Sequence, residues 1–204
     1  MTFWQNYFNK RSNSLADLAD ELGWDFSKKD EYGLISLMRD FKLFRRGHSR
    51  KIKNILGYKD EGMDMDVQVF DYQYTISAGN SHRRISQSVF FVQSKTLELP
   101  QFYLRPEDFF QKIAKFFGRQ DINFESHPEF SDQYLLQSPD EERLRKKLSP
   151  DLLHFFSVEK KWCLEGLGYY LIFYRNSKRF NRHELRELID KGHSIFDMLT
   201  NNLV

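Results

Sequence analysis

The residues best suited to contact a charged partner are basic, and six of them fall in one nine-residue run. They are Arg45, Arg46, His48, Arg50, Lys51 and Lys53. Charges this close together could contact the phosphates of a nucleic acid, a nucleotide or a lipid. We predict a strand here, starting over residues 41–46, so at most half of these side chains share a face. The simpler interpretation is a solvated sheet edge whose charge discourages strand pairing, neutralised by the acids that follow over residues 60–66.

Two smaller polar groups could also contact a partner. One is at the tip of a predicted hairpin and the other surrounds Pro128: His82, Arg83 and Arg84, then Glu125, His127 and Glu129. An exposed loop often carries binding residues, but an ordinary polar turn explains the first group equally well. The second group fits either a compact loop packed on the sheet or the polar rim of a site, because Pro128 favours an extended conformation at His127.

We find no catalytic or metal-binding signature. The six histidines are scattered, and none pairs with a cysteine at zinc-ligand spacing. Cys163 lies in a predicted strand with nothing nearby in sequence to lower its pKa, which favours an inert buried thiol. Phosphate-binding loops, dinucleotide fingerprints and nucleophile elbows do not occur. We therefore predict no catalytic residue, no metal and no cofactor, and expect a binding protein rather than an enzyme.

Aromatic residues are concentrated at the start of the chain. Phe3, Trp4, Tyr7 and Phe8 repeat at helical spacing, with Lys10 and Arg11 just beyond. One interpretation is a short helix docked on the core. The other is a peripheral amphipathic segment over residues 1–11 that lies in a membrane interface, where tryptophan, tyrosine and basic residues are favoured.

The overall composition indicates one globular domain over residues 1–204. The chain has 31 basic and 29 acidic residues and a formal charge of +2, so total charge does not point to an anionic partner. Its single cysteine excludes an intrachain disulfide and fits a reducing compartment. No stretch is long and apolar enough to be a membrane span, and the start does not resemble a secretory signal. These features predict a cytoplasmic protein, with membrane association left open by the aromatic segment.

Strands are expected in hairpins and helices in separate blocks. The clearest signal is a hairpin of residues 65–76 and 83–92 with one apolar face, extended by a strand over 96–104. A second hairpin is predicted over 158–164 and 169–174. The absence of βαβ alternation predicts an α+β fold, with a mainly antiparallel sheet and helices packed mostly on one face.

Helix boundaries are predicted from capping residues. Separate helices are expected to begin at Phe3 and at Ser14, and another to begin at Pro106 and end at Gly118. Ser138 with Glu141, and Asn181 with Glu184, have the spacing of capping boxes. A further helix is predicted after Ser149–Pro150.

Three segments resemble a family of uncharacterised bacterial proteins. They are Gly57-x-x-x-x-Gly62 ahead of the 69–74 strand, Leu99-Pro100-x-Phe102-x-Leu104-Arg105-Pro106-Glu107, and Phe124-x-x-x-Pro128-x-Phe130-Ser131-x-x-Tyr134-Leu135-Leu136. The resemblance covers roughly residues 14–200. Several cyanobacterial members carry an N-terminal membrane anchor, which the aromatic segment replaces here. The resemblance to this family implies no activity, cofactor or catalytic residue.

Three functional hypotheses come first, and an enzyme of unfamiliar type is left open as the last. The first is a non-catalytic binding or interaction domain, peripheral to the inner membrane, that contacts a protein or an anionic membrane surface. The second is a small-molecule binding protein with an aromatic-lined pocket built from Phe70, Tyr72, Tyr74, Phe90 and Phe91, although aromatic residues on a sheet more often fill a core. The third is nucleic-acid binding through residues 45–53, which the near-neutral total charge disfavours.

Overall fold

The computed structural model describes residues 3–31, 33–79, 81–107 and 121–201, with the backbone alone for residues 3–9. The helices are α1 (Phe3–Leu22), α2 (Leu34–Leu37), the 3₁₀ helix η1 (Leu43–Arg45), α3 (Pro128–Gln133), α4 (Glu141–Lys147), α5 (Pro150–Val158) and α6 (Arg182–Thr200). The strands are β1 (Asp25–Lys29), β2 (His48–Asp60), β3 (Met65–Ala78), β4 (Ser81–Ser94), β5 (Leu99–Pro106), β6 (Tyr134–Gln137), β7 (Trp162–Gly168) and β8 (Tyr170–Arg175). All the strands form one antiparallel sheet in the order β1-β2-β3-β4-β8-β7-β5-β6.

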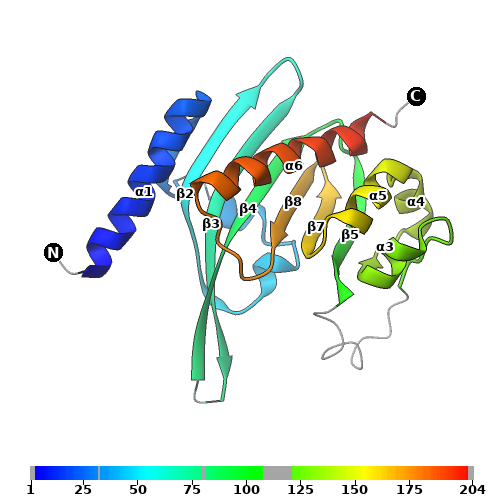
Figure 1. The fold of residues 1–204 in the computed structure, drawn as a ribbon, viewed down its shortest axis with the longest axis horizontal. Coiled ribbons are helices and arrows are strands. Elements are labelled where there is room, and N and C mark those ends of the chain that lie inside the picture. The colour runs from blue at the N-terminus through cyan, green and yellow to red at the C-terminus, as the bar shows by residue number, and fades with distance from the viewer. Residues whose placement is uncertain (1–2, 32, 80, 108–120, 202–204) are drawn as a thin grey trace.

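The predicted α+β class is confirmed, with most helices on one face of the sheet. In Figure 1, α6 crosses that face, α1 lies beside β2, and α3, α4 and α5 gather near β5. Residues of all five helices share one apolar cluster with the sheet. The opposite face is covered by α2 and η1, which pack on a second cluster. None of the described helices is both long and apolar enough to cross a membrane.

The long hairpin is confirmed, but its single apolar face is not. β3 and β4 pair in continuous register from Met65↔Ser94 to Ala78↔Ser81. Val69 and Phe90 are buried on the side of α6, whereas Phe70 is buried on the side of η1. The hairpin is central in the sheet, so both of its faces are covered and both carry apolar residues.

Two predicted helix starts are corrected. α1 is one continuous helix through Ser14, because no helix breaker separates the two predicted segments. Pro106 ends β5 and pairs with Tyr134, so it does not begin a helix. The rest of the helix predicted from Pro106 to Gly118 falls almost entirely on residues 108–120, outside the described residues.

Capping predictions succeed at α5 and α6 and fail at α4. Asn181 and Glu184 form the complete capping box of α6, and Ser149 caps α5. At α4 the cap is Asp140, whose side chain accepts from the backbone N–H of Arg143. Ser138 instead donates to the carbonyl oxygen of Gln101 at 2.7 Å, which ties the loop before α4 to β5.

Candidate functional site

The start of the basic run is not a strand but the 3₁₀ helix η1. The arginines of the run make different contacts. Arg46 points inward, where Nη2 donates to the Tyr103 hydroxyl at 2.7 Å and Nη1 donates to Asn176 Oδ1 at 3.1 Å. Arg50 donates to the backbone carbonyl oxygens of residues 45–47. These two arginines therefore hold the η1 turn in place on the sheet.

The rest of the run is exposed. β2 lies between β1 and β3 in the sheet, but β1 pairs with it only over residues 53–57, so among the described strands residues 48–52 pair with β3 alone. Arg45 forms an exposed ion pair with Asp40, with 3.1 Å between Nη2 and Oδ1. Lys51 and Lys53 are exposed on β2, opposite Gln73 and Asp71 of β3 respectively. The acids predicted to neutralise the run lie at the other end of β2, around its turn into β3.

The hairpin tip, predicted as a separate contact, adjoins the basic run. His48 Nε2 and His82 Nδ1 both lie 2.9 Å from Ser77 Oγ, which links β2, β3 and β4. Arg83 and Arg84 are exposed on β4, a few residues from the tip. The structure thus brings together two basic groups that the sequence places some thirty residues apart.

The remaining predicted contacts do not converge on a site. His127 occupies the N-cap position of α3 without a capping bond, and Glu125 and Glu129 are exposed beside it. The side chains of the aromatic segment, Phe3, Trp4, Tyr7 and Phe8, lie outside the described residues. The aromatic residues proposed to line a pocket are buried core residues, Phe70, Tyr72, Tyr74, Phe90 and Phe91.

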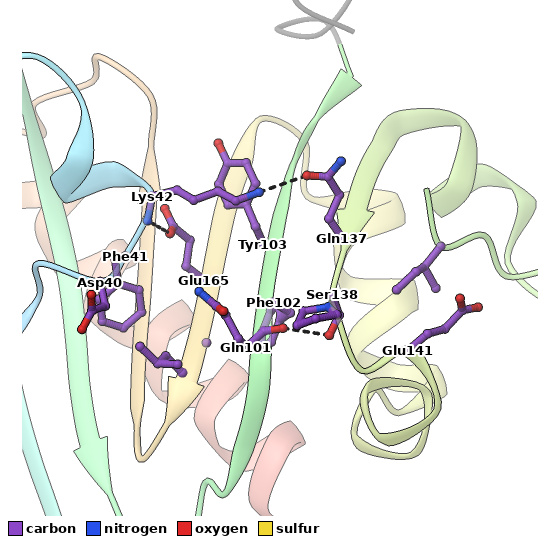
Figure 2. A pocket seen from close by; sticks show the side chains of 14 residues that line it. Asp40, Phe41, Lys42, Gln101, Phe102, Tyr103, Gln137, Ser138, Glu141 and Glu165 are labelled. Carbon is purple, nitrogen blue, oxygen red and sulfur yellow. Dashed lines mark hydrogen bonds between the residues drawn. The ribbon is translucent and has the colours of Figure 1, made fainter. Parts of the chain in front are cut away.

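A cleft opens elsewhere, at the β5–β6–β7 side of the sheet. It has a volume of about 370 Å³. Figure 2 shows one wall formed by residues 40–42, the opposite wall by residues 137–141, and β5 and β7 between them. The apolar part of the lining consists of Phe41, Phe102, Ile122, Pro139 and Leu167. Gly166 is required on the floor, because a Cβ there would lie 2.2 Å from the Phe102 ring.

The charged group at the bottom of the cleft is Glu165, which is 2% exposed. Its carboxylate accepts the backbone N–H of Lys42 at 2.6 Å, the N–H of Leu43 at 3.1 Å and the Tyr174 hydroxyl at 2.8 Å. Burial raises the pKa of Glu165, while the bond from Tyr174 acts to lower it. The carboxylate is therefore a structural anchor that fixes the start of η1 over β7.

Lys42 joins the two walls of the cleft. Its Nζ donates to Gln137 Oε1 at 3.0 Å and lies 4.3 Å from the centre of the Tyr103 ring (Figure 2). Tyr103 and Gln137 are paired neighbours on β5 and β6. An ammonium, an amide and an aromatic ring are thus held together by the sheet register at one end of the cleft.

The polar residues behind the cleft are too deeply buried for nucleophilic chemistry. Burial raises the pKa of the Cys163 thiol to about 12, which keeps it protonated. Asn176 Nδ2 lies 3.2 Å from its sulfur. Burial also raises the pKa of Tyr103 and of Tyr174. Among the described residues, no three histidine, cysteine, aspartate or glutamate side chains are grouped to hold a metal ion.

Sequence patterns did not indicate this cleft. The hairpin predicted over 158–164 and 169–174 leaves Glu165 in its connecting turn, but Glu165 lies inside β7, and the turn falls at Gly168–Tyr169. Lys42 is one of many lysines. Glu165 itself was a usable signal, because it is an acid within an apolar stretch of sequence. An acid that is buried in such a strand requires hydrogen-bond donors around its carboxyl group.

Comparison with known proteins identifies a fold neighbour. No family model and no curated protein matches the chain. The crystal structure of the mycobacterial trehalose monomycolate transport factor A, TtfA, is similar with a TM-score of 0.61 and 12% identity, over 92% of this chain and 93% of that one. At this identity the similarity establishes a shared fold.

Proposed function

We propose that this chain is a non-catalytic binding domain whose cleft takes a neutral, hydroxyl-bearing small molecule. The observation that carries this proposal is the polar lining around Lys42, Tyr103 and Gln137, set in an open cleft of about 370 Å³. Clefts of this size with a few convergent polar groups are typical ligand sites. The setting we propose is the cytoplasm, next to a membrane.

The charges of the lining select against other ligand classes. One ammonium, on Lys42, is accompanied by the carboxyl groups of Asp40, Glu141 and Glu165, of which Asp40 and Glu141 form ion pairs with Arg45 and Arg145. The lining therefore offers an anion no excess of positive charge. A wholly apolar ligand would cover the exposed amide of Gln101 without offering it a hydrogen-bond partner. A hydroxyl both donates and accepts, and therefore suits a lining that mixes ammonium, amide, hydroxyl and carboxylate groups.

The fold neighbour supports the same ligand class. TtfA is named a trehalose monomycolate transport factor, and trehalose is a neutral disaccharide with many hydroxyl groups. We propose a comparable role for this chain, that of an accessory protein that binds the headgroup of a glycolipid without transforming it.

Trehalose is the probe that tests this proposal. We expect it to shift the backbone amide NMR signals of residues 40–42, 101–103 and 137–141, with weak affinity because the cleft is open. The variant K42M/Q137L should lose these shifts, whereas the control K59M/Q73L, outside the cleft, should keep them. Shifts elsewhere, or shifts unchanged in K42M/Q137L, would contradict the assignment. Conversion of trehalose to a product would contradict a non-catalytic role.

A further inference from the structure

The charges of this nearly neutral chain are segregated along the sequence. Residues 1–16, 41–59 and 72–97 contain no aspartate or glutamate, although the whole chain has 29 acidic residues. The same segments hold twelve lysines and arginines. A total charge of +2 therefore conceals a strongly basic subset of residues.

The fold brings these three acid-free segments together. The start of β2 pairs with the end of β3, which pairs with the start of β4. The N-terminal half of α1 joins them through Arg11, whose Nη2 and Nε lie 2.6 and 2.7 Å from the carboxylate of Asp71 on β3. Ser12 donates to Asn54 of β2 at 2.6 Å. Asp71, an acid between the segments, is thereby neutralised.

We define the basic arm as residues 48–53, 72–78 and 81–86. In Figure 1 it includes the projecting end of the β3–β4 hairpin, beyond the helices that cover the sheet. On the face shared with α1, the strand register places Lys51, Lys53 and Arg84 together. His48 and His82 continue this face through their shared contact with Ser77. The basic arm thus presents exposed positive charge on this face, while Arg83 lies beside Ile76 on the other face.

We propose that the basic arm, with the start of α1, docks on an anionic lipid surface. The aromatic residues of the first turns, Phe3, Trp4, Tyr7 and Phe8, precede the Arg11 anchor to the arm. Aromatic residues favour the headgroup depth of a membrane, and basic residues beside them meet anionic headgroups. Ile76, on the opposite face of the arm, is an exposed apolar side chain at 42%.

Single-stranded nucleic acid is the competing partner, and the basic face does not favour it. Sequence-tolerant binding of a single strand uses aromatic side chains as stacking platforms between the basic groups. The neighbours of Lys51 and Arg84 on this face are instead Gln73, Thr75 and Ser86. The aromatic rings on this face are those of His48 and His82, which pack edge to face against each other. The face therefore offers charge for a headgroup phosphate, with no aromatic platform between Lys51 and Arg84.

Co-sedimentation of the full chain with vesicles tests the docking surface. We expect binding to phosphatidylcholine vesicles that contain phosphatidylglycerol, weakened by salt, and little binding to phosphatidylcholine alone. The variant K51Q/R84Q should lose about 30-fold in partitioning, the effect expected for two basic residues at an anionic surface. The control K59Q/K95Q removes equal charge at the opposite end of these strands, near the end of β2 and just after β4. Each of these lysines lies near an aspartate, and the control should bind normally.

Further measurements distinguish the lipid surface from the alternative partners. W4S should weaken vesicle binding, whereas inorganic phosphate should not compete for it if the lipid surface is the partner. Equal partitioning of K51Q/R84Q and its control would overturn the proposal. So would tighter binding of a single-stranded oligonucleotide that the same variant abolishes. The cleft variant K42M/Q137L should bind vesicles normally, which separates this inference from the proposed ligand site.

Discussion

The cleft and the basic arm use residues from one short basic run in opposite ways. Arg46 is drawn into the buried polar residues behind the cleft, where it contacts Tyr103 and Asn176. Lys51, five residues later, is exposed on the arm. The comparison shows that residues of like charge that are adjacent in sequence need not form one charged surface. What each charge does is decided by the backbone turn between the two residues.

That turn depends on Gly47. Its φ of 58° lies in the left-handed region, and a Cβ at this position would lie 2.2 Å from the carbonyl oxygen of Thr75. Glycine alone avoids both penalties. The chain can therefore leave η1 above the cleft and enter β2 directly against β3, so that the start of the arm lies next to the buried network.

The largest expected effect is at the base of the basic arm. Arg11→Met removes the paired hydrogen bonds to Asp71 and the bond to the carbonyl oxygen of Phe180, and leaves Asp71 charged and largely buried. We expect a loss of about 3 kcal/mol in the free energy of unfolding, measured by urea denaturation.

Glu21→Gln is the matched control on the same helix. It removes exposed ion pairs with Arg182 and Arg186 and should leave the unfolding midpoint nearly unchanged. A wild-type midpoint for Arg11→Met would show that the basic arm and α1 are not held together by this pair.

The next effect is at the floor of the cleft. Glu165→Gln places an amide NH₂ against backbone donors and should cost about 2 kcal/mol near pH 5. Because burial raises the pKa of Glu165 above its usual 4.5, its contribution to stability is present below that pH. The contribution is lost as the pH rises through the folded pKa. The stability of wild type relative to Glu165→Gln should therefore fall with rising pH in urea titrations.

Tyr174→Phe removes a single hydrogen-bond donor to the Glu165 carboxylate. It is therefore a milder change at the same site than Glu165→Gln. It should cost about 1 kcal/mol. A wild-type advantage over Glu165→Gln that grows with pH would contradict the burial-raised pKa and the role of Glu165 as a buried anchor.

The smallest expected effect is on the outer face of the basic arm. K51Q/R84Q should change the free energy of unfolding by less than about 0.5 kcal/mol, because both side chains are exposed. Thermal unfolding measures this directly. A large destabilisation would show that these charges hold the fold, and the contrast between a structural cleft floor and an exposed basic face would fail.

The local elements of this protein are largely determined by its sequence. The β3–β4 hairpin follows from its alternating β-branched and aromatic residues, and the start of α6 from the Asn181–Glu184 box. These signals act between residues close in the chain, so they are visible without the fold. Predictions failed where two local preferences competed, as at Pro106, which suits a helix start but ends a strand whose partner Tyr134 is distant in sequence.

Both candidate sites were decided by the tertiary structure. Lys42 meets Gln137 and Glu165 only because η1 lies over β7 and β6 pairs with β5. The basic arm exists because acid-free segments of β2 and the β3–β4 hairpin become neighbours, and Arg11 ties α1 beside them. The sequence supplies the charges, but their grouping depends on long-range strand pairing and helix packing, which no local pattern of residue types encodes.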